Sequence, residues 1–561
     1  MPGEEGIRRS ELHYFTKESK KLTRVTPKWK DESYSSTSWF EDSSVMRFIR
    51  RDRVRRNAEL CALDTRTGKV EVLISEAIED ANLSLQSARH LKKRKEFIWW
   101  SERSGWGHYY LYDSDGKLKN PITRGLFRAS SIIAVDEEKG IMWFRGNGRE
   151  KGENIYYEHL YRVYLDGTGL TLLDPGNATH RSTTSPTRAF LVDNSSRIDM
   201  TPKSVLRDNT GKKIMGLEEA DLSKLREIGW KIPETFVVKA ADGTTNLYGN
   251  MWKPFDFDPS KKYPIIASVY PGPQMEGVSH SFSSSSSQQQ LAQLGFIVVQ
   301  VGHRGGTPKR SKSYHAHSYG NLRDYGLADK KTALEQLAAR HAYIDIDRVG
   351  IYGHSGGGFM SAAAVLKEPY NDFFRVAVAS SGNHDNNIYN SSWGERYHGM
   401  KEVAVEEKST QGDESKRRSS SQSDQTQGKE KSSKTNSQAE KSKKVDGEKD
   451  KSTTAKKTKE TKFEITVPTN AELAENLKGH LLLVHGELDT NVHPANTMRL
   501  ADALLKANKR FDMLILPGTG HGYGKYRNYF THRMWEHFTE HLLGDTQPGA
   551  DILEKSRFKN H

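Results

Sequence analysis

Three residues of the types that activate a hydroxyl nucleophile, Ser355, Asp489 and His521, occur in that order in this chain of 561 residues. A serine hydroxyl is a weak nucleophile until a base takes its proton, and an imidazole can do so near neutral pH. A buried carboxylate can then hold the imidazole in the required tautomer. Taken singly, Asp489 could open a helix and His521 could be an ordinary loop histidine. Together, the three indicate acyl transfer through a serine.

Ser355 lies in Gly353-His-Ser-Gly-Gly357, a pattern that chance can supply in a chain with 46 glycines. The residues on either side of the pattern therefore decide whether it forms a nucleophile elbow. A β-type run from Arg348 precedes it and a helix-type run to Leu366 follows it. This strand-turn-helix context is that of a nucleophile elbow, in which side chains in place of the two outer glycines would crowd the turn. We predict an elbow, rather than a surface glycine loop, with the backbone N–H of Gly356 as an oxyanion donor.

From residue 231 onward, buried apolar strands alternate with amphipathic helices, which predicts a mostly parallel sheet covered on both faces. Catalytic groups in such sheets lie at the carboxyl ends of strands. Asp489 and His521 each follow a predicted strand in this way. Tyr270 ends another strand, and its hydroxyl suits a second oxyanion donor. The alternative is that its ring only packs. We predict an α/β-hydrolase catalytic domain over residues 231–561.

Residues 1–230 contain recurring strand-turn-strand phrases whose turn glycines, Gly68, Gly116, Gly167 and Gly211, are spaced by 44 to 51 residues. This spacing is close to the roughly 40–50 residues of a four-stranded propeller blade. We predict an all-β domain, a partial β-propeller of four to five blades that is incomplete. An irregular β-sandwich is the alternative, because its strands and turns look similar.

Residues 401–462 are rich in Lys, Glu, Ser, Gln and Thr and contain no aromatic residue. Such a segment buries too little apolar surface to offset the entropy of ordering it. We predict a disordered insertion within the catalytic domain. A tolerated surface loop explains it better than a tether for a partner, because long loops cost little additional closure entropy.

The net charge of +13 raises the question of nucleic-acid binding. The basic runs at 47–56 and 90–95 lie in strand-like repeats without a nucleic-acid-binding motif, so we expect a solvated basic face. Cys61 is the single cysteine, which excludes an internal disulfide. His315 and His317 lack a neighbouring carboxylate or cysteine partner, and we predict neither a metal site nor a cofactor. No apolar run has membrane-spanning length, and the compartment stays undetermined.

The chain resembles the prolyl oligopeptidase family of serine peptidases, in particular its dipeptidyl-peptidase-IV-like branch. The motifs that carry the resemblance are Gly353-His-Ser-Gly-Gly357, Val269-Tyr-Pro-Gly-Pro273, Asp489-Thr-Asn-Val-His493 and Gly520-His-Gly522. The resemblance covers the whole chain except the insertion. It implies a propeller followed by a hydrolase domain, peptide substrates and no cofactor.

The same resemblance assigns roles to individual residues. Tyr270 corresponds to the family's oxyanion tyrosine, and Asn491 to the asparagine that holds a backbone carbonyl of the substrate. Tyr389 and Trp393 correspond to the aromatic walls of the S1 pocket. Trp393 stands where the best-known members use tyrosine, so strict specificity for proline does not follow.

One family feature is missing from the sequence. Dipeptidyl peptidases of this branch bind the substrate's amino terminus with a paired-glutamate motif on the propeller. Glu137-Glu138 lies in a predicted turn and Glu218-Glu219 in a helix-like run, so each pair is better explained as solvated charge. We therefore expect the chain to be shortened at its N-terminus by several blades.

The sequence as a whole predicts a serine peptidase that cleaves peptide bonds through an acyl-enzyme. Two alternatives stay open: a noncatalytic interaction protein with an open propeller, and an esterase of small acyl esters. Dipeptidyl-peptidase activity is not established by the sequence because the glutamate pair is missing, and a homodimer is left open.

Overall fold

The computed structural model describes residues 1–40, 44–405 and 460–546. The chain forms two compact units, one of residues 1–401 with 465–561 and a small one of residues 402–464. Most of the insertion that the sequence predicts to be disordered, residues 406–459, lies outside the described residues. Its two described ends differ from that prediction, because β26 (Lys401–Ala404) and β27 (Thr461–Glu464) pair as a two-stranded sheet.

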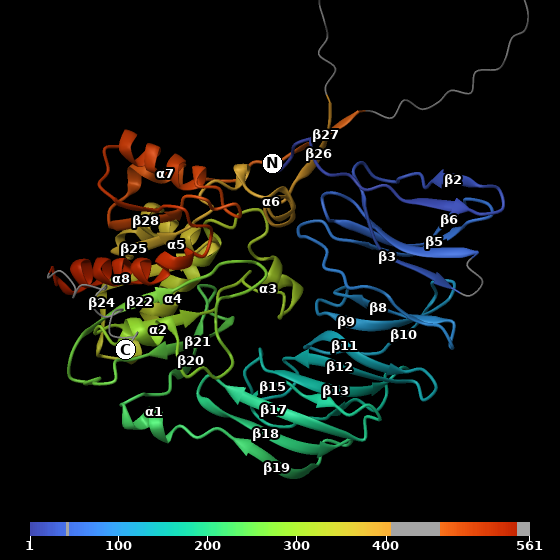
Figure 1. The fold of residues 1–561 in the computed structure, drawn as a ribbon, viewed down its shortest axis with the longest axis horizontal. Coiled ribbons are helices and arrows are strands. Elements are labelled where there is room, and N and C mark those ends of the chain that lie inside the picture. Colours follow the sequence, from blue (N-terminus) through green and yellow to red (C-terminus); the bar gives the residue numbers. More distant parts are fainter. Residues whose placement is uncertain (41–43, 406–459, 547–561) are drawn as a thin grey trace, which may run out of the picture. The chain divides into compact units, whose positions relative to one another are not determined.

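The first part of the larger unit consists of antiparallel β-sheets that follow one another along the chain (Figure 1). A hairpin of β1 (His13–Thr16) and β2 (Lys21–Arg24) comes first. The strands of the four larger sheets are β3 (Ser33–Phe40), β4 (Val45–Arg51), β5 (Asn57–Asp64) and β6 (Val70–Ala77); β7 (Arg89–Leu91), β8 (Glu96–Ser101), β9 (His108–Asp113) and β10 (Leu118–Pro121); β11 (Arg128–Asp136), β12 (Ile141–Asn147), β13 (Glu158–Tyr164) and β14 (Thr171–Leu172); and β15 (Thr179–His180), β16 (Thr183–Thr184), β17 (Phe190–Arg197), β18 (Met200–Asp208) and β19 (Lys213–Glu219).

The four repeating glycines occupy the same place in these four sheets, the turn between the last two strands. Gly68, Gly116, Gly167 and Gly211 have φ values of 73°, 83°, 87° and 90°. Only glycine adopts such values without steric cost. Each repeat in the sequence therefore corresponds to one sheet. The turn before the last strand of that sheet requires a residue with positive φ.

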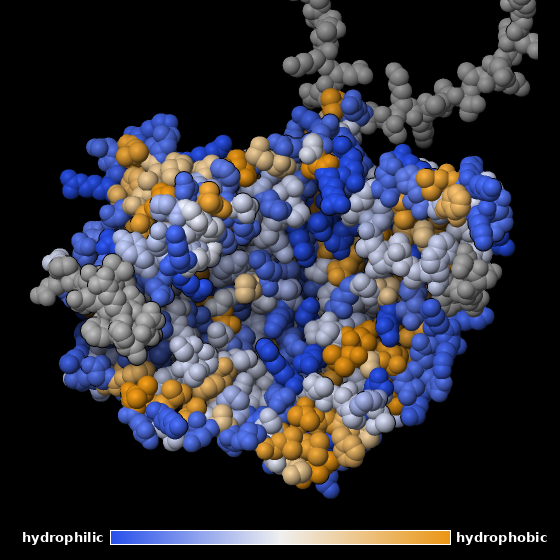
Figure 2. Space-filling view, in the orientation of Figure 1, coloured by the Kyte–Doolittle hydropathy of each residue, from blue (hydrophilic) through white to orange (hydrophobic). Residues whose placement is uncertain are grey.

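The pair Glu218-Glu219 is not in a helix, as the sequence suggested, but at the end of β19. This strand pairs with β18 along one edge, and all seven of its residues are exposed. Because neither face is buried, nothing imposes the alternation of apolar and polar residues by which a strand is recognised. Ile214, Met215 and Leu217 on it are exposed, and Figure 2 shows apolar surface where β19 lies in Figure 1.

The remainder of the larger unit is built on one eight-stranded sheet, in the order β20-β21-β23-β22-β24-β25-β28-β29. The first two strands run antiparallel to their neighbours, and the last six are mutually parallel. The strands are β20 (Glu234–Lys239), β21 (Asn246–Trp252), β22 (Tyr263–Ser268), β23 (Ile297–Val301), β24 (Ile344–His354), β25 (Val376–Ser380), β28 (His480–Gly486) and β29 (Asp512–Leu516).

Helices cover both faces of this sheet because successive strand residues point to opposite sides. Ile265 and Ala267 pack with α4 (Tyr325–Arg340), α5 (Gly356–Leu366) and α7 (Ala495–Lys506), whereas Ile266 packs with α2 (Ser287–Ala292) and α8 (Arg527–Phe538). The α/β-hydrolase architecture expected from the sequence is therefore observed.

The shorter helices are α1 (Ser223–Glu227), α3 (Lys312–Ala316) and α6 (Ser391–His398). Within the described parts of the chain, we find no helix with the length and apolar character that crossing a bilayer requires.

Candidate active site

Ser355 lies at a sharp turn between β24 and α5, with φ 59° and ψ −122°. This backbone region is nearly exclusive to glycine and costs a non-glycine residue about 1–3 kcal/mol, so the surrounding structure must impose it. The Ser355 N–H donates to the carbonyl of Ser380 on the neighbouring strand at 2.8 Å. The turn holds the serine at the carboxyl end of the sheet.

The two outer glycines of the pattern allow the turn to lie against the strand beside it. A Cβ at Gly353 would come within 2.5 Å of the carbonyl oxygen of Val269, and one at Gly357 within 2.4 Å of the same atom. Real Cβ atoms do not approach a backbone oxygen so closely. The glycines therefore set the packing of the elbow on the segment that leads to Tyr270.

We expect Gly353→Ala to lower the free energy of unfolding by about 1–3 kcal/mol, the usual cost of overpacking a close contact. Chemical denaturation measures this difference. Gly216→Ala is the matched control, because a Cβ there meets nothing within 4 Å. Equal effects of the two substitutions would contradict the packing role of Gly353.

Asp489 and His521 lie in the loops that follow β28 and β29, and they are hydrogen-bonded to each other. The distance from His521 Nδ1 to Asp489 Oδ2 is 2.7 Å, and the Asp489 side chain is fully buried. The other carboxylate oxygen, Oδ1, accepts the backbone N–H groups of Asn491 and Val492, each at 2.9 Å. Burial alone would raise the pKa of Asp489, but these hydrogen bonds outweigh it and hold the pKa below its ordinary value.

The ring of His521 lies beside the elbow. Its centroid lies 4.5 Å from that of His354, the residue directly before Ser355. Among the described residues, Ser355 and His521 share no direct hydrogen bond, whereas the hydroxyl of Ser355 is hydrogen-bonded to that of Tyr270. Bonds between a base and its nucleophile commonly tighten only when substrate is bound.

Tyr270 lies just after β22 and faces the elbow. The position that a Cβ of Gly356 would take is 3.8 Å from Cζ of the Tyr270 ring, so the phenol and the first residue of α5 border the same space. Burial raises the pKa of Tyr270, although the hydrogen bond from Ser355 opposes this shift. The phenol therefore keeps its proton near neutral pH and can donate it to a negatively charged oxygen.

A cavity of about 110 Å³ opens beside Ser355. Tyr389 and Trp393 form part of its wall and lie edge to face with ring centroids 5.6 Å apart. The hydroxyl of Tyr389 donates to Oδ1 of Asn491 at 3.3 Å. The residues predicted for the S1 pocket and for carbonyl binding thus line the cavity that contains the nucleophile.

The sequence interpretation missed several residues that line this cavity: Pro271, Gly272, Gln274, Leu322, Phe359 and Asn383. Phe359 could have been predicted from the sequence. It lies one helical turn after Ser355 on α5, so the two side chains share a face of the helix. Leu322 and Asn383 lie in loops, and no local pattern marks them. No side chain of the described cavity wall carries a formal charge, so the structure offers no substitute here for the missing glutamate pair.

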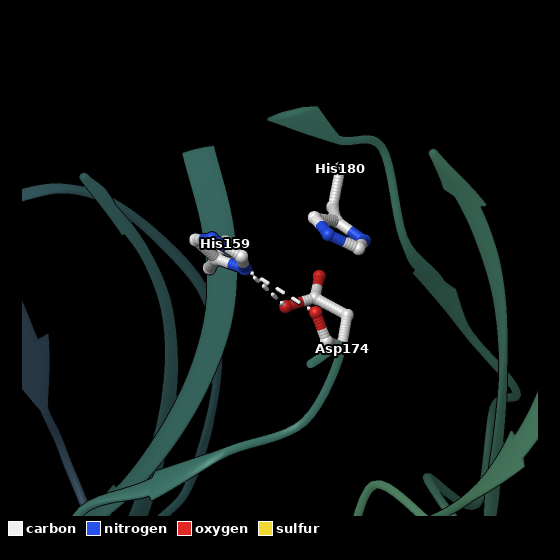
Figure 3. Close-up of side chains that lie close together, drawn as sticks. All are labelled: His159, Asp174 and His180. Carbon is white, nitrogen blue, oxygen red and sulfur yellow. Dashed lines mark hydrogen bonds and ion pairs between the residues drawn. The ribbon is translucent and has the colours of Figure 1, made fainter. Parts of the chain in front are cut away.

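Two groups of side chains among the described residues have metal-ligand types close together. His159, Asp174 and His180 are buried between β13 and β15 (Figure 3). The four ring nitrogens already have partners: Asp174 and Glu153 for His159, and Asp193 and the carbonyl of Gly176 for His180. Hydrogen bonding therefore accounts for this cluster without a metal. The second group, Asp512, His537 and His541, lies away from Ser355 at the other end of β29.

The His159 cluster predicts a pH dependence of stability. Burial alone would lower the pKa of His159, but Asp174 and Glu153 raise it to about 9. A raised pKa stabilises the folded state fully below the unfolded value of about 6.5 and loses that stabilisation as the pH rises toward 9. We expect a loss of about 3 kcal/mol over this range.

Urea denaturation at pH 6 and pH 9.5 measures this loss. His159→Gln should remove most of the pH dependence, whereas His13→Gln, a replacement outside the cluster, should leave it unchanged. The same loss in all three proteins would show that His159 is not responsible.

Two family models match the chain. The Dipeptidyl peptidase IV (DPP IV) N-terminal region matches residues 10–202, and the Prolyl oligopeptidase family matches residues 281–426 and 441–545. The first match covers the first three repeated antiparallel sheets and part of the fourth. The second contains Ser355, Asp489 and His521.

Curated relatives carry related names. Dipeptidyl peptidase 8 of Homo sapiens is 28% identical over 433 residues, which are 74% of this chain and 40% of the relative. Dipeptidyl peptidase 4 of Trichophyton equinum is 24% identical over 445 residues, which are 78% of this chain and 49% of the relative. The chain thus spans less than half the length of these two relatives.

The fold is shared with solved structures. The crystal structure of Porphyromonas gingivalis dipeptidyl peptidase 4 superposes with a TM-score of 0.72 at 21% identity, covering 95% of this chain and 67% of that one. A likeness at this identity concerns the fold alone. The chain therefore matches the prolyl oligopeptidase family over most of its parallel-sheet part, and the N-terminal region of dipeptidyl peptidase IV over most of its antiparallel sheets.

Proposed function

We propose that this protein is a serine peptidase that hydrolyses peptide bonds through an acyl-enzyme on Ser355. The observation that carries the proposal is the hydrogen-bonded pair of Asp489 and His521 beside a serine in a strained elbow. The three residues follow parallel strands of one sheet, and such strand ends are where α/β enzymes place catalytic groups.

In the proposed mechanism, Ser355 Oγ attacks the scissile carbonyl carbon while Nε2 of His521 takes the hydroxyl proton. Asp489 holds the proton on Nδ1 and stabilises the imidazolium that forms. The oxyanion accepts hydrogen bonds from the Tyr270 hydroxyl and the Gly356 N–H. His521 then gives its proton to the leaving amine, and water hydrolyses the acyl-enzyme by the same route.

The cavity beside Ser355 supports a proposal on specificity. Tyr389 donates to Oδ1 of Asn491, which leaves the Asn491 amide N–H groups to hold a substrate carbonyl. The volume of about 110 Å³ is well below that of pockets for drug-sized ligands, roughly 300–1,000 Å³. We therefore propose that the residue before the scissile bond has a small apolar side chain, and that Tyr389 and Trp393 enclose it.

The proposal divides the chain into a partial β-propeller over residues 1–230 and a catalytic domain over residues 231–561. The curated relatives are named dipeptidyl peptidases. For this chain we propose peptide hydrolysis, without assigning a dipeptidyl-peptidase specificity. A homodimer stays a prediction, which light scattering on the purified protein would test.

A fluorophosphonate probe together with a set of peptide p-nitroanilides tests the proposed function. We expect the probe to label the wild-type protein on Ser355, and turnover to be faster with alanine or proline before the scissile bond than with phenylalanine or arginine. Absence of labelling and of turnover in the folded protein would refute a serine peptidase. Labelling with hydrolysis of small esters alone would favour the esterase alternative.

A further inference from the structure

The loop that carries Tyr270, residues 269–277, is held by three side chains from one neighbouring segment. Tyr314 on α3 donates its hydroxyl to Oε1 of Glu276. His315, the next residue, donates Nε2–H to the carbonyl oxygen of Pro273 at 2.8 Å. Tyr325, at the start of α4, donates its hydroxyl to the carbonyl oxygen of Pro271 at 3.0 Å. One segment, residues 314–325, therefore holds three points along this Tyr270 loop.

These contacts are buried and lie close to the catalytic tyrosine. Glu276, Tyr314 and His315 are each less than a tenth exposed. Gly277, with φ 68°, lies so near Tyr270 that a Cβ there would be 2.9 Å from the tyrosine Cβ. Glu276 directly precedes Gly277 in the chain. A displacement of Glu276 therefore moves the backbone that packs against Tyr270.

The same helix also contacts the β-sheet region. The Lys312 N–H donates to the carbonyl of Gly105 at 2.8 Å, and Nζ of Lys312 lies 3.1 Å from a carboxylate oxygen of Glu102. Both partners lie between β8 and β9. The hydroxyl of Tyr156, just before β13, donates to that of Tyr314 at 3.4 Å. Two of the antiparallel sheets thus contact α3.

We propose that α3 is a positioning element through which the β-sheet region sets the place of the Tyr270 hydroxyl relative to Ser355. This inference rests on the proposed function, in which Tyr270 donates to the oxyanion. A donor displaced by a fraction of an ångström still permits substrate binding but stabilises the developing charge less well. Loss of the α3 contacts should therefore lower kcat and leave KM nearly unchanged.

Two variants test the contacts of α3. Tyr314→Phe removes the hydroxyl that donates to Glu276 and accepts from Tyr156. Lys312→Met removes the charge that meets Glu102 while keeping most of the stem. Tyr319→Phe is the control for the first, because its hydroxyl is buried without a hydrogen-bond partner among the described residues. Lys309→Met is the control for the second, since the described contacts of the Lys309 side chain include no hydrogen bond or ion pair.

We expect kcat to fall about tenfold or more in both test variants, with KM within about twofold, and to stay near the wild-type value in both controls. Tyr270→Phe should cost about 10²–10³ in kcat, and adding Tyr314→Phe to it should cost little more, because both act through one donor. An unchanged kcat in both test variants would overturn the proposal. So would a full additional loss in the Tyr270→Phe background.

Amide hydrogen exchange separates this proposal from the peptidase proposal. The amides of residues 274–277 should exchange faster in Tyr314→Phe and in Lys312→Met than in the two controls. If the wild-type protein neither reacts with fluorophosphonate nor cleaves peptides, the proposed function fails. The exchange measurement still decides the positioning role, because unchanged exchange in the Tyr270 loop would overturn it.

Discussion

Ser355→Ala is expected to lower kcat for peptide hydrolysis by about a millionfold, the loss seen when the nucleophile of a serine-based triad is removed. The proposed route has no second group that can form the acyl-enzyme, so only binding and oxyanion stabilisation remain. Stability should change little, since alanine occupies the same strained backbone position and deletes only an oxygen atom. Single-turnover assays, fluorophosphonate labelling and thermal denaturation measure these effects.

Ser260→Ala serves as the control for this prediction. Among the described residues, its hydroxyl bonds to Asp258 alone, in an exposed turn, so activity and labelling should match those of the wild type. Equal labelling of Ser355→Ala and wild-type protein would place the reactive nucleophile elsewhere and refute the assigned role of Ser355.

Asp489→Asn is expected to lower kcat by about ten-thousandfold, the usual cost of leaving the histidine in the wrong tautomer. The backbone N–H groups of Asn491 and Val492 point at Oδ1 and would hold the amide oxygen of the new residue there. The amide NH₂ would then face Nδ1 of His521, where the carboxylate oxygen now lies at 2.7 Å. It would donate to Nδ1 and force the imidazole proton onto Nε2, the atom that must accept the proton of Ser355.

The pH dependence of the residual activity tests this explanation. Hydroxide can replace the lost base, so the residual rate of Asp489→Asn should keep rising at alkaline pH, whereas the wild-type rate should level off there because His521 itself accepts the proton of Ser355. Asp502→Asn, on the exposed side of α7, should behave as wild type, because the one described partner of its carboxylate is Lys506. A rate of Asp489→Asn within tenfold of the wild-type rate would refute the role of Asp489.

The elbow and the repeating sheets were predictable because their signals are local. Glycines on either side of Ser355 and in the closing turns mark positions where a Cβ does not fit or where φ is positive. The order of Ser355, Asp489 and His521 was informative because parallel strands bring their carboxyl ends to one edge. Residues 218–219 were misread because β19, exposed along its whole length, has no buried face to impose alternation on its sequence.

The role of His315 was not predictable from its surroundings in the sequence. The residues near it in the sequence offer it no partner, and the atom that its ring contacts, the carbonyl oxygen of Pro273, lies 42 residues away. The same holds for Glu276, Tyr314 and Lys312, whose partners lie in segments far away in the sequence. A backbone carbonyl leaves no mark on the amino-acid sequence, so such contacts emerge only from the folded chain.

The sequence by itself determined the chemistry that this protein can offer and the kind of element that carries each group, because glycine, strand and helix signals extend over a few residues. The tertiary structure alone decided how those groups are held. The 2.7 Å contact of His521 with Asp489 joins separate loops of the chain. The same is true of the cavity, which brings Tyr389 and Trp393 beside Ser355 and Asn491, and of the contacts of α3 with the Tyr270 loop. Their geometry depends on packing between elements, which no local pattern encodes.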